Sequence, residues 1–323
     1  MTIRRALTLT LIVATLATLA GCTRTFSAST PTPFWTPLPA TFAFPTVSPA
    51  TPSATTSPAS PVAPTGVLST ISPGQTQVVT CPATGSMGVV LVTPDEVLNI
   101  RSGPGVENDI EGIYSSNETD IALSGASEIV DGSRWVQVCV EGEPVGWVNA
   151  TYLTEVLPSG QFCGDARVTS LLDKMQTAFA NRDGQAFASL VSPTHGVYVW
   201  LWNSGLPVNF DAAHAGFAFE SDFVNDWGTH PASGIETSGT FHELVLPELQ
   251  DTFVASAQRR CNDGEISSYG ETWPAEYANI NFYQVVRPGT PGVELDWNVF
   301  LVGVEYVNGQ PYLFSLIHFI WTP

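Results

Sequence analysis

The sequence predicts a multidomain chain: a small all-β unit precedes an α+β domain, behind an N-terminal linker rich in proline, threonine and serine. Three patterns support this prediction. Residues 87–155 hold short strand-like runs broken by glycine, proline and asparagine, which is typical of an all-β unit. Residues 171–179 carry leucine, methionine and phenylalanine at helical spacing. Near the C-terminus, Asn308-Gly309 separates two strand-like runs and indicates a tight hairpin within an antiparallel meander.

These patterns divide the chain into four parts. Residues 1–22 form a leader, and residues 23–77 form the linker. The all-β unit occupies residues 78–157, and the α+β domain, whose function the sequence does not assign, occupies residues 160–323.

The leader carries the most specific pattern in the chain. Arg4 and Arg5 precede an apolar run of 14 residues from Ala6 to Leu19, and Ala20-Gly21-Cys22 follows. This resembles a bacterial lipoprotein signal peptide with its lipobox. The resemblance implies that the Cys22 thiol is lipidated and that the chain is anchored to the extracytoplasmic face of the cell membrane. The run is short of the roughly 18–20 residues that span a bilayer, although an uncleaved anchor and cleavage without lipid remain alternatives.

The linker is expected to be disordered. It contains eleven prolines from Pro31 to Pro73, and proline removes backbone donors, so that neither helix nor sheet can propagate. We expect an extended, partly polyproline-II stalk that holds the folded parts away from the membrane.

Charge disfavours some partners. All 30 acidic residues lie from Asp95 onward, where only 8 of the 11 basic residues accompany them. We therefore expect no nucleic-acid partner, since binding nucleic acid needs lysine and arginine against the phosphates.

Four cysteines besides Cys22 are expected to form two disulfides in an exported chain. The pairing Cys81–Cys139 with Cys163–Cys261 is favoured because each bond then joins residues of one domain. Free thiols and a zinc site are the alternatives, but the sequence contains no C-x-x-C pair. We expect no metal and no cofactor.

The all-β unit resembles a bacterial SH3 (SH3b) domain. The resemblance covers nearly the whole unit and rests on L-N-I-R-S-G-P-G at residues 98–105, the tryptophan strand at 135–140 and G-W-V at 146–148. It implies an SH3-like barrel and a binding module for cell-wall peptides or glycans. Its implied groove would use exposed aromatic side chains, for which the candidates are Tyr114, Trp135, Trp147 and Tyr152. In the alternative interpretation both tryptophans belong to the core and the unit is only a spacer.

The α+β domain is expected to begin with helices and to end with three strands. A further helix is predicted at residues 248–257, and the strands at residues 277–286, 293–306 and 312–321. This order of elements resembles the nuclear-transport-factor-2-like cone, or a cystatin-like sheet. The resemblance implies a pocket between helix and sheet and assigns no residue roles.

Two further sets of side chains are candidates for ligand binding. Alternation along residues 197–202 places Tyr198, Trp200 and Trp202 on one face of a strand. If Val307 pairs with Gln310, His318 lies opposite Val299.

On its own strand, His318 then shares a face with Phe314, Leu316 and Ile320. A hydrogen-bonded histidine within an aromatic face is the plainer interpretation, and a pocket base is the alternative.

The sequence contains no recognised catalytic motif, including G-x-S-x-G, Ser-x-x-Lys and H-E-x-x-H. We therefore expect no catalytic residues and a membrane-anchored interaction protein that contacts peptidoglycan or an envelope partner. A cell-envelope hydrolase with its site in the α+β domain, and a ligand-binding sensory lipoprotein, remain alternatives.

Overall fold

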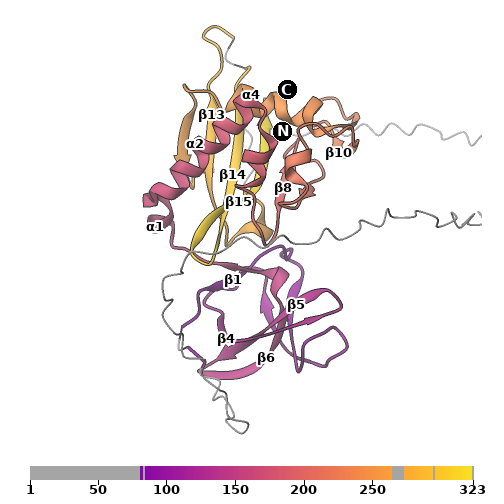
Figure 1. The fold of residues 1–323 in the computed structure, drawn as a ribbon, viewed down its shortest axis with the longest axis vertical. Helices are drawn as coiled ribbons and strands as arrows, with labels where there is room; N and C mark the ends of the chain where they lie inside the picture. The colour runs from indigo at the N-terminus through magenta and orange to yellow at the C-terminus, as the bar shows by residue number, and fades with distance from the viewer. Residues whose placement is uncertain (1–80, 83, 264–272, 294, 322–323) are drawn as a thin grey trace, which may run out of the picture. The chain divides into compact units, whose positions relative to one another are not determined.

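A computed structural model describes residues 81–82, 84–263, 273–293 and 295–321 of the chain. The predictions about the leader, Cys22 and the stalk lie outside these residues. The described residues fall within one compact unit. They are mostly β-structure with a few helices, and the largest sheet curls into a half-barrel (Figure 1).

A five-stranded antiparallel sheet forms within the first part of this unit, with the strand order β3-β2-β6-β5-β4. Its strands are β2 (Val97–Arg101), β3 (Ile110–Ser115), β4 (Ala122–Val130), β5 (Ser133–Val140) and β6 (Glu143–Asn149).

Two loops of two residues fix the register of this sheet. Asp131-Gly132 joins β4 to β5 and Glu141-Gly142 joins β5 to β6, and all four residues have positive φ. Loops of this kind match the right-handed twist of the flanking strands. Leu98, from β2, and Val138, from β5, are buried in a common core.

The second sheet contains eight strands. Its path runs β1-β7-β14-β15-β8-β9, while β13 pairs with β14 and β12 pairs with β13. The strands are β1 (Met87–Val89), β7 (Leu153–Glu155), β8 (Val197–Trp200), β9 (Val208–Phe210), β12 (Gln258–Cys261), β13 (Asn281–Arg287), β14 (Asn298–Val307) and β15 (Gln310–Ile320). The predicted C-terminal meander is therefore present as β13, β14 and β15.

Helices cover one face of this sheet (Figure 1). The helices are α1 (Ser159–Gly164), α2 (Ala166–Asn181), α3 (Gly184–Ala188) and α4 (Leu246–Thr252). The apolar stripe of α2 packs against β14 and β15. An open hollow of about 420 Å³ remains between α2 and the start of β15, and its lining includes Arg167, Leu171 and Tyr312.

The ends of α2 result from local chemistry. The Asp165 side chain accepts a hydrogen bond from the Arg167 amide and caps the N-terminus. Arg182 takes the left-handed conformation, with φ of 53°, and ends the helix.

The predicted helix at residues 248–257 is shorter than expected. It begins at Leu246 and ends at Thr252, because Phe253 adopts φ and ψ of −84° and 58°, outside the helical region. Soon afterwards the chain enters β12.

Short elements complete the described fold. They are the helical turns η1 (Ala150–Tyr152), η2 (Ala215–Phe217), η3 (Phe241–Val245) and η4 (Ala275–Tyr277), and the paired strands β10 (Asn225–Thr229) and β11 (Glu236–Gly239).

The predicted pairing of His318 is wrong by one residue. Val307 does pair with Gln310, but the register shifts between Gly303 and Val304, so that His318 lies opposite Phe300 instead of Val299. The shift adds one residue to β15, as in a β-bulge, and reverses the facing of the β15 residues beyond it.

As a consequence, Phe314 lies in a different core cluster from Leu316. His318 does not share a face with Phe314, because its ring stacks on Phe300, which belongs to the cluster that contains Leu316.

Both favoured disulfides are present. Cys81 is bonded to Cys139 in β5, and Cys163 of α1 is bonded to Cys261 in β12. They close loops of 58 and 98 residues, which restricts the unfolded chain and stabilises the fold.

Candidate functional site

An open groove lies along β2 and the residues after β6. We call it the Trp135 groove. Its volume is about 530 Å³, which is within the usual range for ligand sites. Its lining residues are Leu91, Val92, Glu96, Val97, Leu98, Asn99, Arg101, Val106, Trp135, Asn149 and Tyr152.

Alternation along two strands builds the groove. Leu98 and Ile100 of β2 are buried in the core, so Asn99 and Arg101 point to the opposite side. Val136 and Val138 of β5 are likewise buried, and Trp135 lines the groove at the start of this strand.

One wall is fixed by the turn η1. The Asn149 side chain accepts a hydrogen bond from the Thr151 amide at 3.0 Å, and so caps the turn. The Tyr152 carbonyl, at the end of this turn, accepts a hydrogen bond from the Val90 amide at 3.0 Å. The Tyr152 ring thus sits on an anchored backbone.

The opposite rim is a loop held by side chains. Arg101 donates to the Asn108 carbonyl at 2.8 Å, and the Asn108 amide donates to the Pro104 carbonyl at the same distance. These bonds position Val106, whose exposed fraction is 61%. Arg101 therefore fixes the loop, whereas the Asn99 side chain makes no hydrogen bond to the described residues and lines the groove.

The chemistry of the groove suits binding. Trp135 is only 4% exposed and forms a floor, while Tyr152 is 37% exposed and forms a wall. Aromatic surfaces stack on flat or apolar ligand groups, and asparagine amides both donate and accept hydrogen bonds. Glu96 is the single acid and Arg101 the single base among the lining residues. One carboxylate does not provide the acid–base pair that glycan hydrolysis uses.

The other two aromatic candidates of the all-β unit lie elsewhere. Tyr114 lies on β3 opposite Leu98, packs against the core, and lines a separate hollow near Cys139. Burial raises the pKa of Tyr114, and the charge of Glu118 adds to the effect. Trp147 of β6 lies opposite Gln137 of β5 and does not line the Trp135 groove.

His318 is enclosed. The residue is 1% exposed, and its ring is sandwiched by Phe300 at 4.5 Å and Trp202 at 6.1 Å between centroids. Nδ1 contacts the Leu201 carbonyl at 3.0 Å and Nε2 contacts Oδ1 of Asn298 at 2.5 Å. Burial lowers the pKa of His318 to about 4, and the hydrogen bond to the Leu201 carbonyl offsets only part of this effect.

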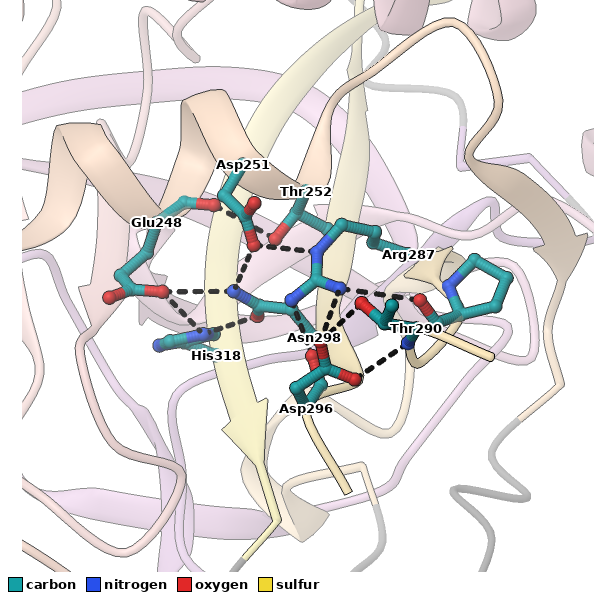
Figure 2. A network of polar contacts seen from close by, with 9 residues as sticks. Glu248, Asp251, Thr252, Arg287, Thr290, Asp296, Asn298 and His318 are labelled. Atoms are coloured by element: carbon teal, nitrogen blue, oxygen red, sulfur yellow. Dashed lines mark hydrogen bonds and ion pairs between the residues drawn. The ribbon is translucent and has the colours of Figure 1, made fainter. Parts of the chain in front are cut away.

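A polar network continues outward from this histidine (Figure 2). The Asn298 amide donates to Glu248 at 2.9 Å and to Asp251 at 3.3 Å, both on α4. Arg287, at the end of β13, donates to Asp251 at 2.6 Å and to the Asp296 carbonyl.

The far end of this network is also satisfied. Asp296 accepts hydrogen bonds from the hydroxyl and the amide of Thr290, and these bonds lower the pKa of Asp296. The network joins α4, the strands β13, β14 and β15, and the loop between β13 and β14. Its side chains bond to one another, and His318 is too deeply buried to touch a substrate.

The aromatic residues of β8 do not form one face. Tyr198 and Trp200 pack in the cluster that contains Phe314, whereas Trp202 lies beyond the end of the strand and packs against the other core cluster. Trp202 contacts His230 and His318 instead. The expectation of a shared surface is wrong because the strand ends at Trp200.

Sequence reasoning selected Trp135 and Tyr152 but missed the polar partners. Asn149 could have been found, since an asparagine two residues before Thr151 is a typical helix cap. Alternation places Asn99 on the side of β2 that faces away from the core. This pattern predicts that Asn99 is exposed, but it does not predict that Asn99 lines a groove.

Comparisons with family models, curated proteins and solved structures found no match to this chain. Within the described residues, no helix is both long and apolar enough to cross a bilayer. The same residues contain no cluster of three or more side chains suited to binding a metal ion.

Proposed function

We propose that this chain is a lipid-anchored extracytoplasmic binding protein, and that the Trp135 groove binds an extended peptide or glycan of the cell wall. The observation that carries the proposal is the combination of Trp135 and Tyr152 with asparagine amide groups in one open groove. Residues 78–157 act as an SH3-like binding module in this proposal.

The sheet order and the sequence motifs support the module. The L-N-I-R-S-G-P-G run supplies β2 and the loop that carries Val106, and the tryptophan strand supplies β5. Both meet in the groove, so the segments that carry the SH3b resemblance are those that build the candidate site.

The leader and the cysteines support the location. A lipidated Cys22 would hold the chain at a membrane surface. The two disulfides fit an oxidising compartment outside the cytoplasm. The long proline-rich stalk would then let the groove reach a wall at some distance from the membrane.

The test is retention of the purified full chain on peptidoglycan. Tyr152→Ala is expected to lower affinity about tenfold, since an aromatic stack contributes about 1–1.5 kcal/mol. Tyr152 is partly exposed, so the fold should survive.

Phe223→Ala is the matched control. Phe223 is 71% exposed and lies outside the groove, so its loss should leave retention unchanged. Equal retention of the chain and of Tyr152→Ala would contradict the proposed role of the groove.

A further inference from the structure

Two segments of the chain form one wall of the Trp135 groove. Leu91 and Val92 follow β1, and the turn η1 ends at Tyr152. The Val90 amide donates to the Tyr152 carbonyl at 3.0 Å, so the two segments are bonded to each other. We call residues 90–92 and 150–152 the groove wall. This wall belongs to the all-β unit in sequence, yet both of its segments are also bonded to the α+β domain.

The first segment is held by the turn η4. The Leu91 amide donates to the Glu276 carbonyl at 2.8 Å, and Val90 is fully buried in the core cluster that contains Tyr277. Leu91 has a φ of 61°, in the left-handed region. This conformation costs free energy for a residue with a Cβ, and it persists only where the surroundings hold it. The contacts with η4 therefore fix Leu91 in a conformation that it would not keep alone.

The second segment is held by His195. The Nε2 atom of His195 contacts the Thr151 carbonyl at 3.0 Å, and its Nδ1 contacts Oε2 of Glu305 at 2.7 Å. A carbonyl only accepts, so Nε2 is the donor to Thr151. The side chains of His195 and Glu305 are each 1% exposed. Because Thr151 directly precedes Tyr152, this bond fixes the backbone that carries the Tyr152 ring.

The support behind His195 is rigid, whereas the turn in front of it is not. Glu305 lies on β14, which is paired on both sides by β13 and β15. The turn η1 has only three residues, and turns of this type have weak hydrogen-bond geometry of their own. A wall that is ordered before the ligand arrives lowers the entropy lost on binding. The bond from His195 thus bears directly on the affinity of the groove.

We propose that the α+β domain completes the binding site, with His195 as a positioning residue that holds Tyr152 in the groove wall through the Thr151 carbonyl. This inference rests on the proposed function of the Trp135 groove. It adds that the affinity of the binding module in residues 78–157 depends on the α+β domain.

Two substitutions at His195 separate its two bonds. The His195→Asn amide takes the place of Nδ1 and keeps the bond to Glu305, but it is too short to reach Thr151. The longer His195→Gln amide takes the place of Nε2 and donates to the Thr151 carbonyl, at the expense of the bond to Glu305. Each variant loses one buried bond, so urea denaturation should show similar losses of stability.

Retention of the full chain on peptidoglycan should nevertheless differ between the two variants. His195→Asn should weaken binding about fivefold, as expected for one hydrogen bond, whereas His195→Gln should bind within about twofold of the original chain. A purely structural role of His195 would weaken binding equally in both.

Hydrogen exchange in the ligand-free chain tests the wall itself. The Val90 amide donates to the Tyr152 carbonyl, so its exchange rate measures how often the wall opens. This rate should be about fivefold higher in His195→Asn than in His195→Gln. The Val136 amide lies on β5, between β4 and β6, and should exchange equally in the two variants.

Equal exchange at Val90 in the two variants would overturn the inference, whatever the ligand does. Equal retention of the two variants would also overturn it, if Tyr152→Ala weakens retention. Unchanged retention of Tyr152→Ala would instead contradict the proposed function of the groove, and the exchange at Val90 would still decide whether His195 holds the wall.

Discussion

The Trp135 groove contains residues similar to those of the polar network that runs from His318 to Thr290, which we call the His318 network. The two differ in how far their side chains are exposed and in whether their polar groups are bonded to one another. Each combines aromatic rings with asparagine and carboxylate groups near strand ends. In the network the asparagine amide bonds to two carboxylates and the histidine ring is buried. In the groove Tyr152 and Val106 remain exposed. Residue type alone therefore does not separate a binding surface from a structural contact; the availability of partners does.

The largest expected effect comes from breaking the network. Asn298→Ala would remove the bonds to Glu248 and Asp251, and the buried Nε2 of His318 would lose its contact with Oδ1 of Asn298. We expect a loss of about 3 kcal/mol in the free energy of unfolding, measured by urea denaturation.

Asn117→Ala is the control for this variant, because Asn117 lies outside the network on the surface of the all-β unit. Its effect should stay within about 0.5 kcal/mol. A change of similar size in both variants would show that the network does not hold the fold together.

The second effect is a pH dependence of stability. Burial lowers the pKa of His318 to about 4 from an ordinary value of 6.5. Between these values the unfolded chain binds the proton more readily, so stability falls as the pH decreases from 6.5 towards 4. The contribution of His318 over this range should be about 3 kcal/mol.

Urea denaturation at several pH values isolates this contribution when the chain is compared with His318→Gln. In the His318→Gln variant the free energy of unfolding should depend less steeply on pH. In His214→Gln, which changes an exposed histidine, the dependence should stay the same. Identical slopes for the chain and His318→Gln would mean that the ring does not titrate in this range.

The smallest effect concerns the groove rim. Val106→Ala should weaken peptidoglycan binding about fourfold, because the burial of roughly one methylene group, about 0.8 kcal/mol, is lost. Val145→Ala removes an exposed valine of β6 outside the groove and should not change retention. If the two variants bind alike, the rim does not contact the ligand.

Local patterns predicted much of the fold. The alternation of Leu98 and Ile100 located β2, helical spacing located α2, and Asn308-Gly309 located the last hairpin. These features depend on neighbours in sequence, which is why they are readable there.

The features that escaped prediction depend on contacts distant in sequence. The bulge that moves His318 opposite Phe300 has no signature in the residues around Gly303. The contact of Thr151 with His195 joins parts of the chain that the sequence patterns assign to separate domains. The aromatic pair of the candidate site was found, whereas Asn99 and Asn149 needed the three-dimensional arrangement.

The most direct test of the central claim follows the indole signals of tryptophan by NMR while soluble peptidoglycan fragments are added to the full chain. The proposed groove predicts a shift of the Trp135 signal and no change for Trp202, whose indole N–H is buried outside the groove. A shift at Trp202 with an unaffected Trp135 would contradict the account, because the ligand would then enter the region of the closed network and not the open groove.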